Sequence, residues 1–251
     1  MSANRLLASL WLLVSAGLLV MPVLGVDPTT RLYYSNAGQV LVTLTASFYC
    51  FATMRAFPAQ SPLGKVWGAI GAGLLAWAIA AGIFAAYPIL NAGEDTPYPS
   101  LADPFYLLAP PLMTIGLVLF KRSAGLESPV WGKALAIAAL AIFGYIAWLA
   151  NAKGLSDPGL FMILVSVGYL LFDPILIAVT LLTASAFRGG DVATSWWYVV
   201  GGILLYFIAN QLYTYLVGIE QYTTGSPIDA GWLLGFGLIA CGAVKARKLL
   251  G

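Results

Sequence analysis

YPSLADPFYLLAPPL, residues 98–112, shows in one stretch the pattern that decides the fold: a short polar turn with one carboxylate leads directly into a long apolar run. The run continues to about residue 120, which is enough for a helix to cross a bilayer. A helix is expected because the run is continuously apolar, whereas a membrane strand would alternate apolar and polar residues. Asp103 stands at the start of this run, where a membrane penalises an unpaired charge.

The same pattern recurs along the whole chain. Its 251 residues are 61% hydrophobic and only 9% charged, and the mean hydropathy is +0.89. Soluble domains carry about a quarter charged residues. We therefore expect a single all-α integral membrane domain over residues 1–251, a polytopic bundle of eight transmembrane helices. The expected spans are roughly 6–26, 33–54, 66–87, 104–120, 132–150, 160–187, 195–219 and 230–248.

The first span resembles a signal peptide, because Arg5 precedes an apolar stretch that ends in small residues near Gly25. Its apolar run of about 20 residues is longer than the ~7–15 of a signal peptide. We therefore expect a retained helix.

Basic residues are distributed unevenly between the expected loops. Only Arg31 and Lys153 of the twelve fall on the side opposite the N-terminus. The other ten are Arg5, Arg55, Lys65, Lys121, Arg122, Lys133, Arg188, Lys245, Arg247 and Lys248. Because cytoplasmic loops carry the excess of basic residues, both termini are expected to be cytoplasmic.

Several classes of site are excluded by composition. The chain contains no histidine, so a His-ligated haem, a His-zinc centre and a Ser-His-Asp triad are absent. Cys50 and Cys241 fall inside apolar spans and are interpreted as small core residues. No loop combines basic residues with aromatic ones as nucleic-acid binding requires, and no phosphate-binding motif is present. We expect no enzymatic activity, no catalytic residue, no metal site and no nucleic-acid partner, and the sequence identifies no cofactor.

Two long stretches suggest an internal repeat. RAFPAQSPLGKVWGAIGAGLLAWAIA (55–80) aligns with RGGDVATSWWYVVGGILLYFIAN (188–210), which places Trp67 against Trp197. Membrane composition alone is the alternative explanation of such a short similarity. Two halves of four spans each would share one orientation and form a parallel repeat. The possible repeats are residues 1–120 and 132–251.

A second pair of stretches places Asp103 against Asp229. PSLADPFYLL (99–108) aligns with SPIDAGWLLG (226–235), and each acid stands where an outer loop enters a helix. One interpretation is that each carboxylate caps free backbone N–H groups, with Pro104 in the first helical position. The other is that both acids face one outer cavity.

Asp173 lies near the middle of the sixth span, where a charged Asp costs about 2.5–3.5 kcal/mol. It must therefore be protonated, paired or close to water. Pro174 allows a local kink, and Asn210 and Gln211 of the seventh span are possible hydrogen-bond partners. A structural polar clasp between two helices and a ligand or proton site both remain open.

Aromatic residues gather toward the outer half of the expected bundle. An interfacial belt explains most of them. Alternatively, some line a cavity with acids at its mouth that suits a small amphipathic or cationic ligand. The candidate ligand-binding residues are Asp103, Tyr106, Asp173, Asn210, Tyr213, Glu220, Asp229 and Trp232.

These motifs resemble the multi-pass membrane sensor region found ahead of diguanylate cyclase (GGDEF) domains in bacterial signalling proteins. That family carries P-S-x-A-D-x-x-Y-L-x-x-Y-P-L, Y-P-x-x-D-x-L-L, A-D-x-x-Y and D-x-x-W-L-L-G-Y in this order. The matching residues here are Asp103, Tyr106, Leu107, Pro111, Tyr169, Asp173, Tyr213, Asp229, Trp232, Leu233, Leu234 and Gly235. The likeness covers roughly residues 33–248.

The departures from the family pattern affect the site. Pro110 replaces a Tyr, Leu170 replaces a Pro, and Asn210 stands where the family commonly has Asp. The missing Asp weakens any proposal of a titrating carboxylate pair. The sequence stops at KARKLLG without an output domain, so we expect either a stand-alone relative or a piece cut after the last helix.

The resemblance implies a sensory or ligand-binding module in the cytoplasmic (inner) membrane of a cell, acting through a protein partner in the membrane or the cytoplasm. A non-catalytic subunit of a larger membrane complex is the alternative, and a small transporter is a third. The bilayer itself is the remaining expected partner.

Overall fold

The computed structural model describes residues 3–91, 94, 96–156, 159–187 and 189–250, and the described chain is all α-helical. The side chain of Arg5 and the whole of Arg188, both used in the charge count, lie outside what is described. The helices are α1 (Ala3–Val20), α2 (Pro28–Ala56), α3 (Pro62–Leu90), α4 (Asp103–Ser123), α5 (Val130–Leu155), α6 (Leu160–Ala184), α7 (Asp191–Gly218) and α8 (Asp229–Lys248).

Within the described residues, seven helices, α2 to α8, are long and apolar enough to cross a membrane. This confirms the polytopic bundle, whereas the expected first span of 6–26 is too long. Helix α1 ends at Val20 because the chain turns over residues 21–25, a stretch that contains Pro22 and ends at Gly25 in the left-handed region (φ 69°). Eight helices are therefore present, of which α1 falls short of the span criterion.

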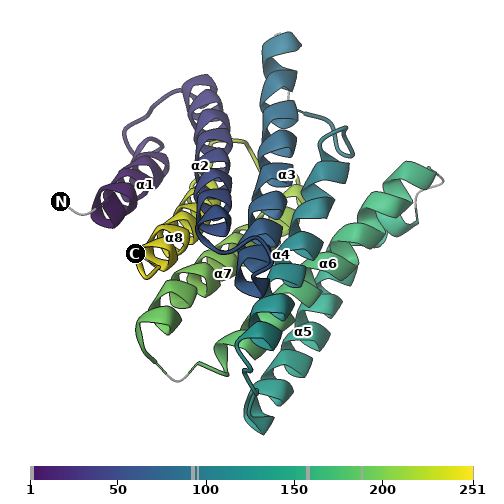
Figure 1. Cartoon of the computed structure of the whole chain (residues 1–251). Coiled ribbons are helices and arrows are strands. Elements are labelled where there is room, and N and C mark those ends of the chain that lie inside the picture. The colour runs from purple at the N-terminus through teal and green to yellow at the C-terminus, as the bar shows by residue number, and fades with distance from the viewer. Residues whose placement is uncertain (1–2, 92–93, 95, 157–158, 188, 251) are drawn as a thin grey trace.

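The helices form a core of six, with two more at the edges (Figure 1). In the core, α3 packs on α2 and α4, α7 packs on α8, α2 packs on α8, and α4 packs on α6. Helix α1 lies against α8 at one edge, and α5 lies against α6 at the other. The two termini lie near each other in this view.

The hairpins α3–α4 and α7–α8 pack through equivalent glycines. A side chain at Gly73 would meet the carbonyl oxygen of Ala109 at 2.9 Å, and one at Gly202 would meet that of Gly235. Gly202 lies 129 residues after Gly73, and Gly235 lies 126 residues after Ala109. Close backbone approach at small residues is the usual packing mode of membrane helices.

A second glycine pair, near the other end of each hairpin, keeps the same offsets. A side chain at Gly116 would meet the Val66 carbonyl, and one at Gly242 would meet the Ser195 carbonyl. These residues are again 126 and 129 positions apart. The packing of the two hairpins therefore repeats, although the division at 1–120 and 132–251 stays a prediction. The offset of 129 pairs Trp67 with Trp196, so the alignment with Trp197 is shifted by one residue.

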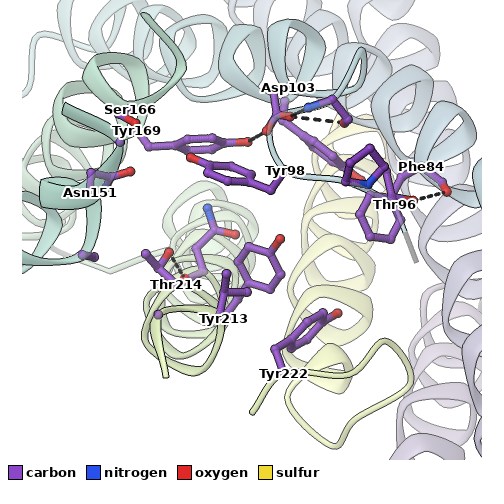
Figure 2. A pocket seen from close by; sticks show the side chains of 18 of the residues that line it. Phe84, Thr96, Tyr98, Asp103, Asn151, Ser166, Tyr169, Tyr213, Thr214 and Tyr222 are labelled. Atoms are coloured by element: carbon purple, nitrogen blue, oxygen red, sulfur yellow. Dashed lines mark hydrogen bonds between the residues drawn. The ribbon is translucent and has the colours of Figure 1, made fainter. Parts of the chain in front are cut away.

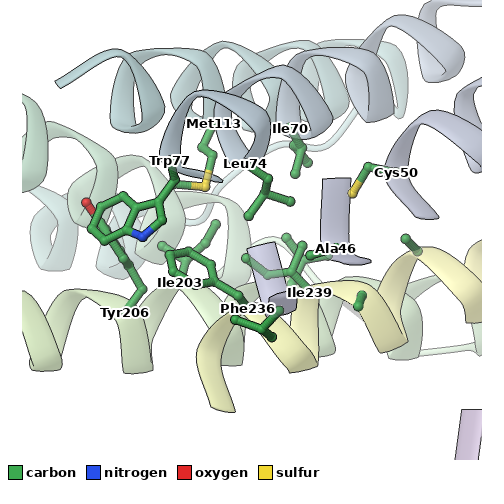
Figure 3. Close-up of a cluster of buried hydrophobic side chains, with 14 of the residues drawn as sticks. Ala46, Cys50, Ile70, Leu74, Trp77, Met113, Ile203, Tyr206, Phe236 and Ile239 are labelled. Atoms are coloured by element: carbon green, nitrogen blue, oxygen red, sulfur yellow. The ribbon is translucent and has the colours of Figure 1, made fainter. Parts of the chain in front are cut away.

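The edge helices break this similarity, because α1 packs on the last helix of the other half whereas α5 packs on its own neighbour α6. Figure 3 shows where the six core helices meet, with Ala46 of α2, Leu74 and Trp77 of α3, Met113 of α4 and Phe236 of α8 converging. The two predicted core cysteines, Cys50 and Cys241, are buried and free. This confirms their interpretation as small core residues.

Toward the end of the bundle that carries the α2–α3 and α6–α7 turns, stacked rings fill the interior. The rings of Trp67 and Trp196 stack with centroids 5.0 Å apart, and Phe120 stacks on Trp196 at 3.6 Å. The opposite end is different, since it carries polar clusters and a cavity.

Candidate functional site

Helix α4 begins with a Ser-x-x-Asp turn at residues 100–103. The Oδ2 atom of Asp103 accepts hydrogen bonds from the Ser100 backbone N–H (2.6 Å) and the Ser100 hydroxyl (3.2 Å). Its Oδ1 atom accepts one from the hydroxyl of Tyr169 on α6 (2.8 Å). This acid therefore joins the start of α4 to α6.

Helix α8 begins with the same turn at residues 226–229. Asp229 is completely buried and accepts hydrogen bonds from the Gly225 N–H (2.8 Å) and from the hydroxyls of Tyr222 (3.1 Å) and Ser226 (3.4 Å). The Ser35 hydroxyl of α2 donates a further bond of 2.6 Å. This acid joins the start of α8 to α2.

The expected capping role needs a correction. Both acids are the first residues of their helices, and both accept from backbone N–H groups that precede the helix, as the acid of a capping box does. They do not cap the N–H groups of the turn that follows, and Pro104 is the second helical residue. Because Tyr169 and Ser35 belong to opposite halves of the chain, the two acids clasp the halves reciprocally.

Asp173 is held in a buried polar chain between α6, α7 and α8. The Tyr206 hydroxyl donates to Oδ1 (3.0 Å) and the Asn210 amide donates to Oδ2 (2.8 Å). Trp232 Nε1 in turn donates to the Asn210 amide oxygen (2.9 Å). The predicted partner Asn210 is found, whereas the other candidate, Gln211, is not among the donors to Asp173. The carboxylate is therefore paired, as its place in an apolar span requires.

A cavity of about 290 Å³ opens at the same end of the bundle as Asp103. Figure 2 shows the rings of Tyr98 and Tyr169 on one side of it and those of Tyr213 and Tyr222 on the other. Its lining comes from α2 to α8 and the loops that follow α3 and α7. The cavity is therefore internal to the bundle and shared between the two halves.

The structure brings most of the predicted ligand-binding residues to this cavity. Those that line it are Asp103, Tyr106, Asn210, Tyr213, Glu220 and Trp232. The other two lie behind the lining, where Asp173 contacts Asn210 and Asp229 contacts Tyr222. Their ligand-binding role stays a prediction, and for Asp173 and Asp229 the geometry supports only an indirect one. The expectation that both terminal acids face one cavity is correct for Asp103 alone.

Several lining residues were not in the predicted set. Trp77 forms part of the wall and contacts Tyr106 (centroids 4.6 Å), Tyr206 (5.0 Å) and Phe236 (5.2 Å). Ser166 lines the cavity from α6. Single aromatic or serine residues in an apolar span carry no pattern that distinguishes a cavity wall from the core, so sequence reasoning had no signal for them.

The hydrogen-bonding capacity left inside the cavity comes mainly from hydroxyls. Among the described residues, the hydroxyls of Tyr106 and Tyr213 have no hydrogen-bond partner, and both residues line the cavity. Asp103 is already bonded to Tyr169 and Ser100. The interior is thus an aromatic enclosure with two unpaired tyrosine hydroxyls.

Charged groups lie at the mouth. Lys153 and Glu220 line the cavity and are exposed, and Glu220 adopts a left-handed backbone conformation (φ 58°). In the flanking loops, burial raises the pKa of Tyr98 to about 12 and, together with the Asp229 carboxylate, raises the pKa of Tyr222 well above its ordinary value. Both tyrosines therefore stay neutral donors at physiological pH.

No cluster of three or more acidic, cysteine or histidine residues that could hold a metal ion occurs in the described part of the chain. Comparison with models of known families, with curated proteins and with solved structures gives no match. The functional argument therefore rests on the geometry of the cavity.

Proposed function

We propose that this protein is a membrane-embedded ligand-binding module, of sensory type, that acts through a protein partner. The observation that carries the proposal is the aromatic cavity enclosed between the two halves of the bundle. Its volume of about 290 Å³ lies at the small end of the ~300–1,000 Å³ typical of ligand sites, and its apolar walls with few polar groups are typical of such sites. A small amphipathic molecule fits this chemistry.

Trp77 offers a route from the cavity to the rest of the bundle. Its ring lies between Tyr106, which lines the cavity, and Tyr206, which donates to Asp173. A ligand that displaces the Tyr106 ring therefore acts on the contact between α6 and α7. These two helices share fewer contacts than the hairpin neighbours do, so their relative position is the easier one to change.

The other end of the bundle is the side on which we place the partner. The stacked rings of Trp67, Trp196 and Phe120 fill the interior there, and the basic ends of α4 and α8 lie in this region. Under the positive-inside rule this end faces the cytoplasm of a cell bounded by its inner membrane. A closed interior suits signalling by helix movement better than passage of a solute.

The proposal is tested by mass spectrometry of material that co-purifies from the native membrane in mild detergent. Ala150 lines the cavity, so Ala150→Phe fills it, whereas Ala141→Phe on the exposed face of the same helix is the matched control. We expect the wild-type protein and the control to retain a small molecule that the Ala150→Phe variant loses. Stoichiometric membrane subunits without any small molecule would contradict the proposal and favour the role of a complex subunit.

A further inference from the structure

The polar groups of the cavity restrict the charge of its ligand, and this inference rests on the proposed function. Asp103 is the only acid buried in the cavity wall, and its two oxygens already accept three hydrogen bonds from Ser100 and Tyr169. A carboxylate with its bonding capacity filled does not need a cationic ligand. The same carboxylate repels an anionic ligand in surroundings of low dielectric constant.

The unpaired groups, in contrast, are neutral. Tyr106 on α4 and Tyr213 on α7 present hydroxyls that no described residue engages. A hydroxyl donates to a carbonyl or ether oxygen and also accepts from a hydroxyl. A buried polar group without a partner is costly, so a ligand that supplies an oxygen gains affinity there.

The walls specify the body of the ligand. The ring of Trp232 lies 5.6 Å from that of Tyr213, and the ring of Trp77 lies 4.6 Å from that of Tyr106. Both tryptophans line the cavity. Aromatic walls prefer flat or ring-shaped apolar partners, which stack or contact edge to face.

We propose that the cavity binds a neutral ring compound that carries a carbonyl or hydroxyl oxygen, held through the hydroxyls of Tyr106 and Tyr213. The charged residues Lys153 and Glu220, one of each sign, stand at the mouth and favour neither ionic class.

The experiment measures binding of four probes by isothermal titration calorimetry to the protein in lipid nanodiscs, with empty nanodiscs as the blank. The probes share one ring system: 2-acetylnaphthalene is a neutral ketone, naphthalene lacks the oxygen, 2-naphthoate is an anion, and 2-naphthyltrimethylammonium is a cation. We expect the ketone to bind about two- to tenfold more tightly than naphthalene, the gain of one neutral hydrogen bond. Both charged probes should bind more weakly than the ketone.

The double variant Tyr106→Phe/Tyr213→Phe keeps the rings and removes the hydroxyls. It should abolish the preference for the ketone and leave naphthalene binding unchanged. Tyr215→Phe is the control, because Tyr215 is exposed on α7 outside the cavity. Tyr213→Phe alone serves if the double variant loses its near-ultraviolet circular dichroism, and it should reduce the preference.

Two outcomes separate the failure of the inference from that of the proposed function. Tightest binding of the cation, or equal binding of ketone and naphthalene, would overturn the neutral oxygen-bearing ligand while a binding site stands. No binding of any probe above the blank, or binding that Ala150→Phe leaves unchanged, would overturn the cavity as a ligand site altogether.

Discussion

Asp103 and Asp229 begin equivalent helices in the two halves with the same Ser-x-x-Asp turn, yet their surroundings differ. Asp229 is completely buried, and its bonds come from a closed set of protein donors. Asp103 forms part of the wall of an open cavity. The comparison teaches that a repeated scaffold supplies the framework twice, while the placement of the edge helices, α5 beside α6 and α1 beside α8, leaves room in one half only.

The largest expected effect comes from removing each acid in turn. Asp229→Ala leaves the donors of Tyr222, Gly225 and Ser35 without an acceptor, so we expect the free energy of unfolding to fall by about 3 kcal/mol. Asp103→Ala should cost about 1 kcal/mol, because water in the cavity can replace the carboxylate. Titration with sodium dodecyl sulfate, followed by circular dichroism, measures both. Equal losses would contradict the difference between the two surroundings.

The shared framework predicts the next effect. Gly202→Ala and Gly73→Ala each force a methyl group against a carbonyl oxygen of the neighbouring helix and should each cost about 1–3 kcal/mol. Gly82→Ala is the matched control, since a side chain there has open space. The same titration decides the point, and a tolerated Gly73→Ala would break the equivalence of the two hairpins.

A smaller effect is expected at the contacts that join the halves. Ser35→Ala removes a buried donor to Asp229 and should lower the free energy of unfolding by about 1 kcal/mol, whereas Tyr169→Phe at the cavity wall should cost less. Adding Ser35→Ala to Asp229→Ala should cost little more, because both remove the same bond. Additive losses in that double variant would show that Ser35 acts elsewhere.

The smallest effect concerns the starts of α2 and α6. Thr30 donates to the Asp27 carboxylate through its hydroxyl and its backbone N–H, and these bonds lower the pKa of Asp27 below its ordinary value of 3.8. A lowered pKa stabilises the folded state above the unfolded pKa, and this contribution is lost as the pH falls below about 3.8. Asp27→Ala should therefore slightly lower the melting temperature at pH 7 and leave it unchanged at acidic pH. An equal loss at both pH values would contradict the assignment.

The sequence was sufficient for the helical membrane bundle, because long apolar runs between short polar turns have few other solutions. It also brought attention to Asp103, Asn210, Tyr213 and Trp232, since polar or repeated residues at the edge of an apolar run are conspicuous. It did not predict that Asp229 is sealed off, because the turn around Asp229 resembles that around Asp103.

The length of α1 and the position of α5 also escaped sequence reasoning. Helix packing in lipid depends on shape and not on hydrophobicity, so an apolar run does not show which neighbour it chooses. The cavity depends on that choice, and residues such as Ala150 of α5 become part of its wall only through it.

The most direct test of the account is to locate a bound ring ketone in the two halves. Benzophenone is a neutral ring ketone that forms covalent adducts on irradiation, and methionine is a preferred target. Met162 lines the cavity, whereas Leu32, which lies 130 residues earlier at the equivalent place in α2, does not. Leu32→Met therefore provides the matched target in the closed half. The account predicts saturable labelling of Met162 that 2-acetylnaphthalene prevents, and none at the introduced methionine. Equal labelling at both positions, or labelling that is confined to the lipid-facing side of α5, would contradict it.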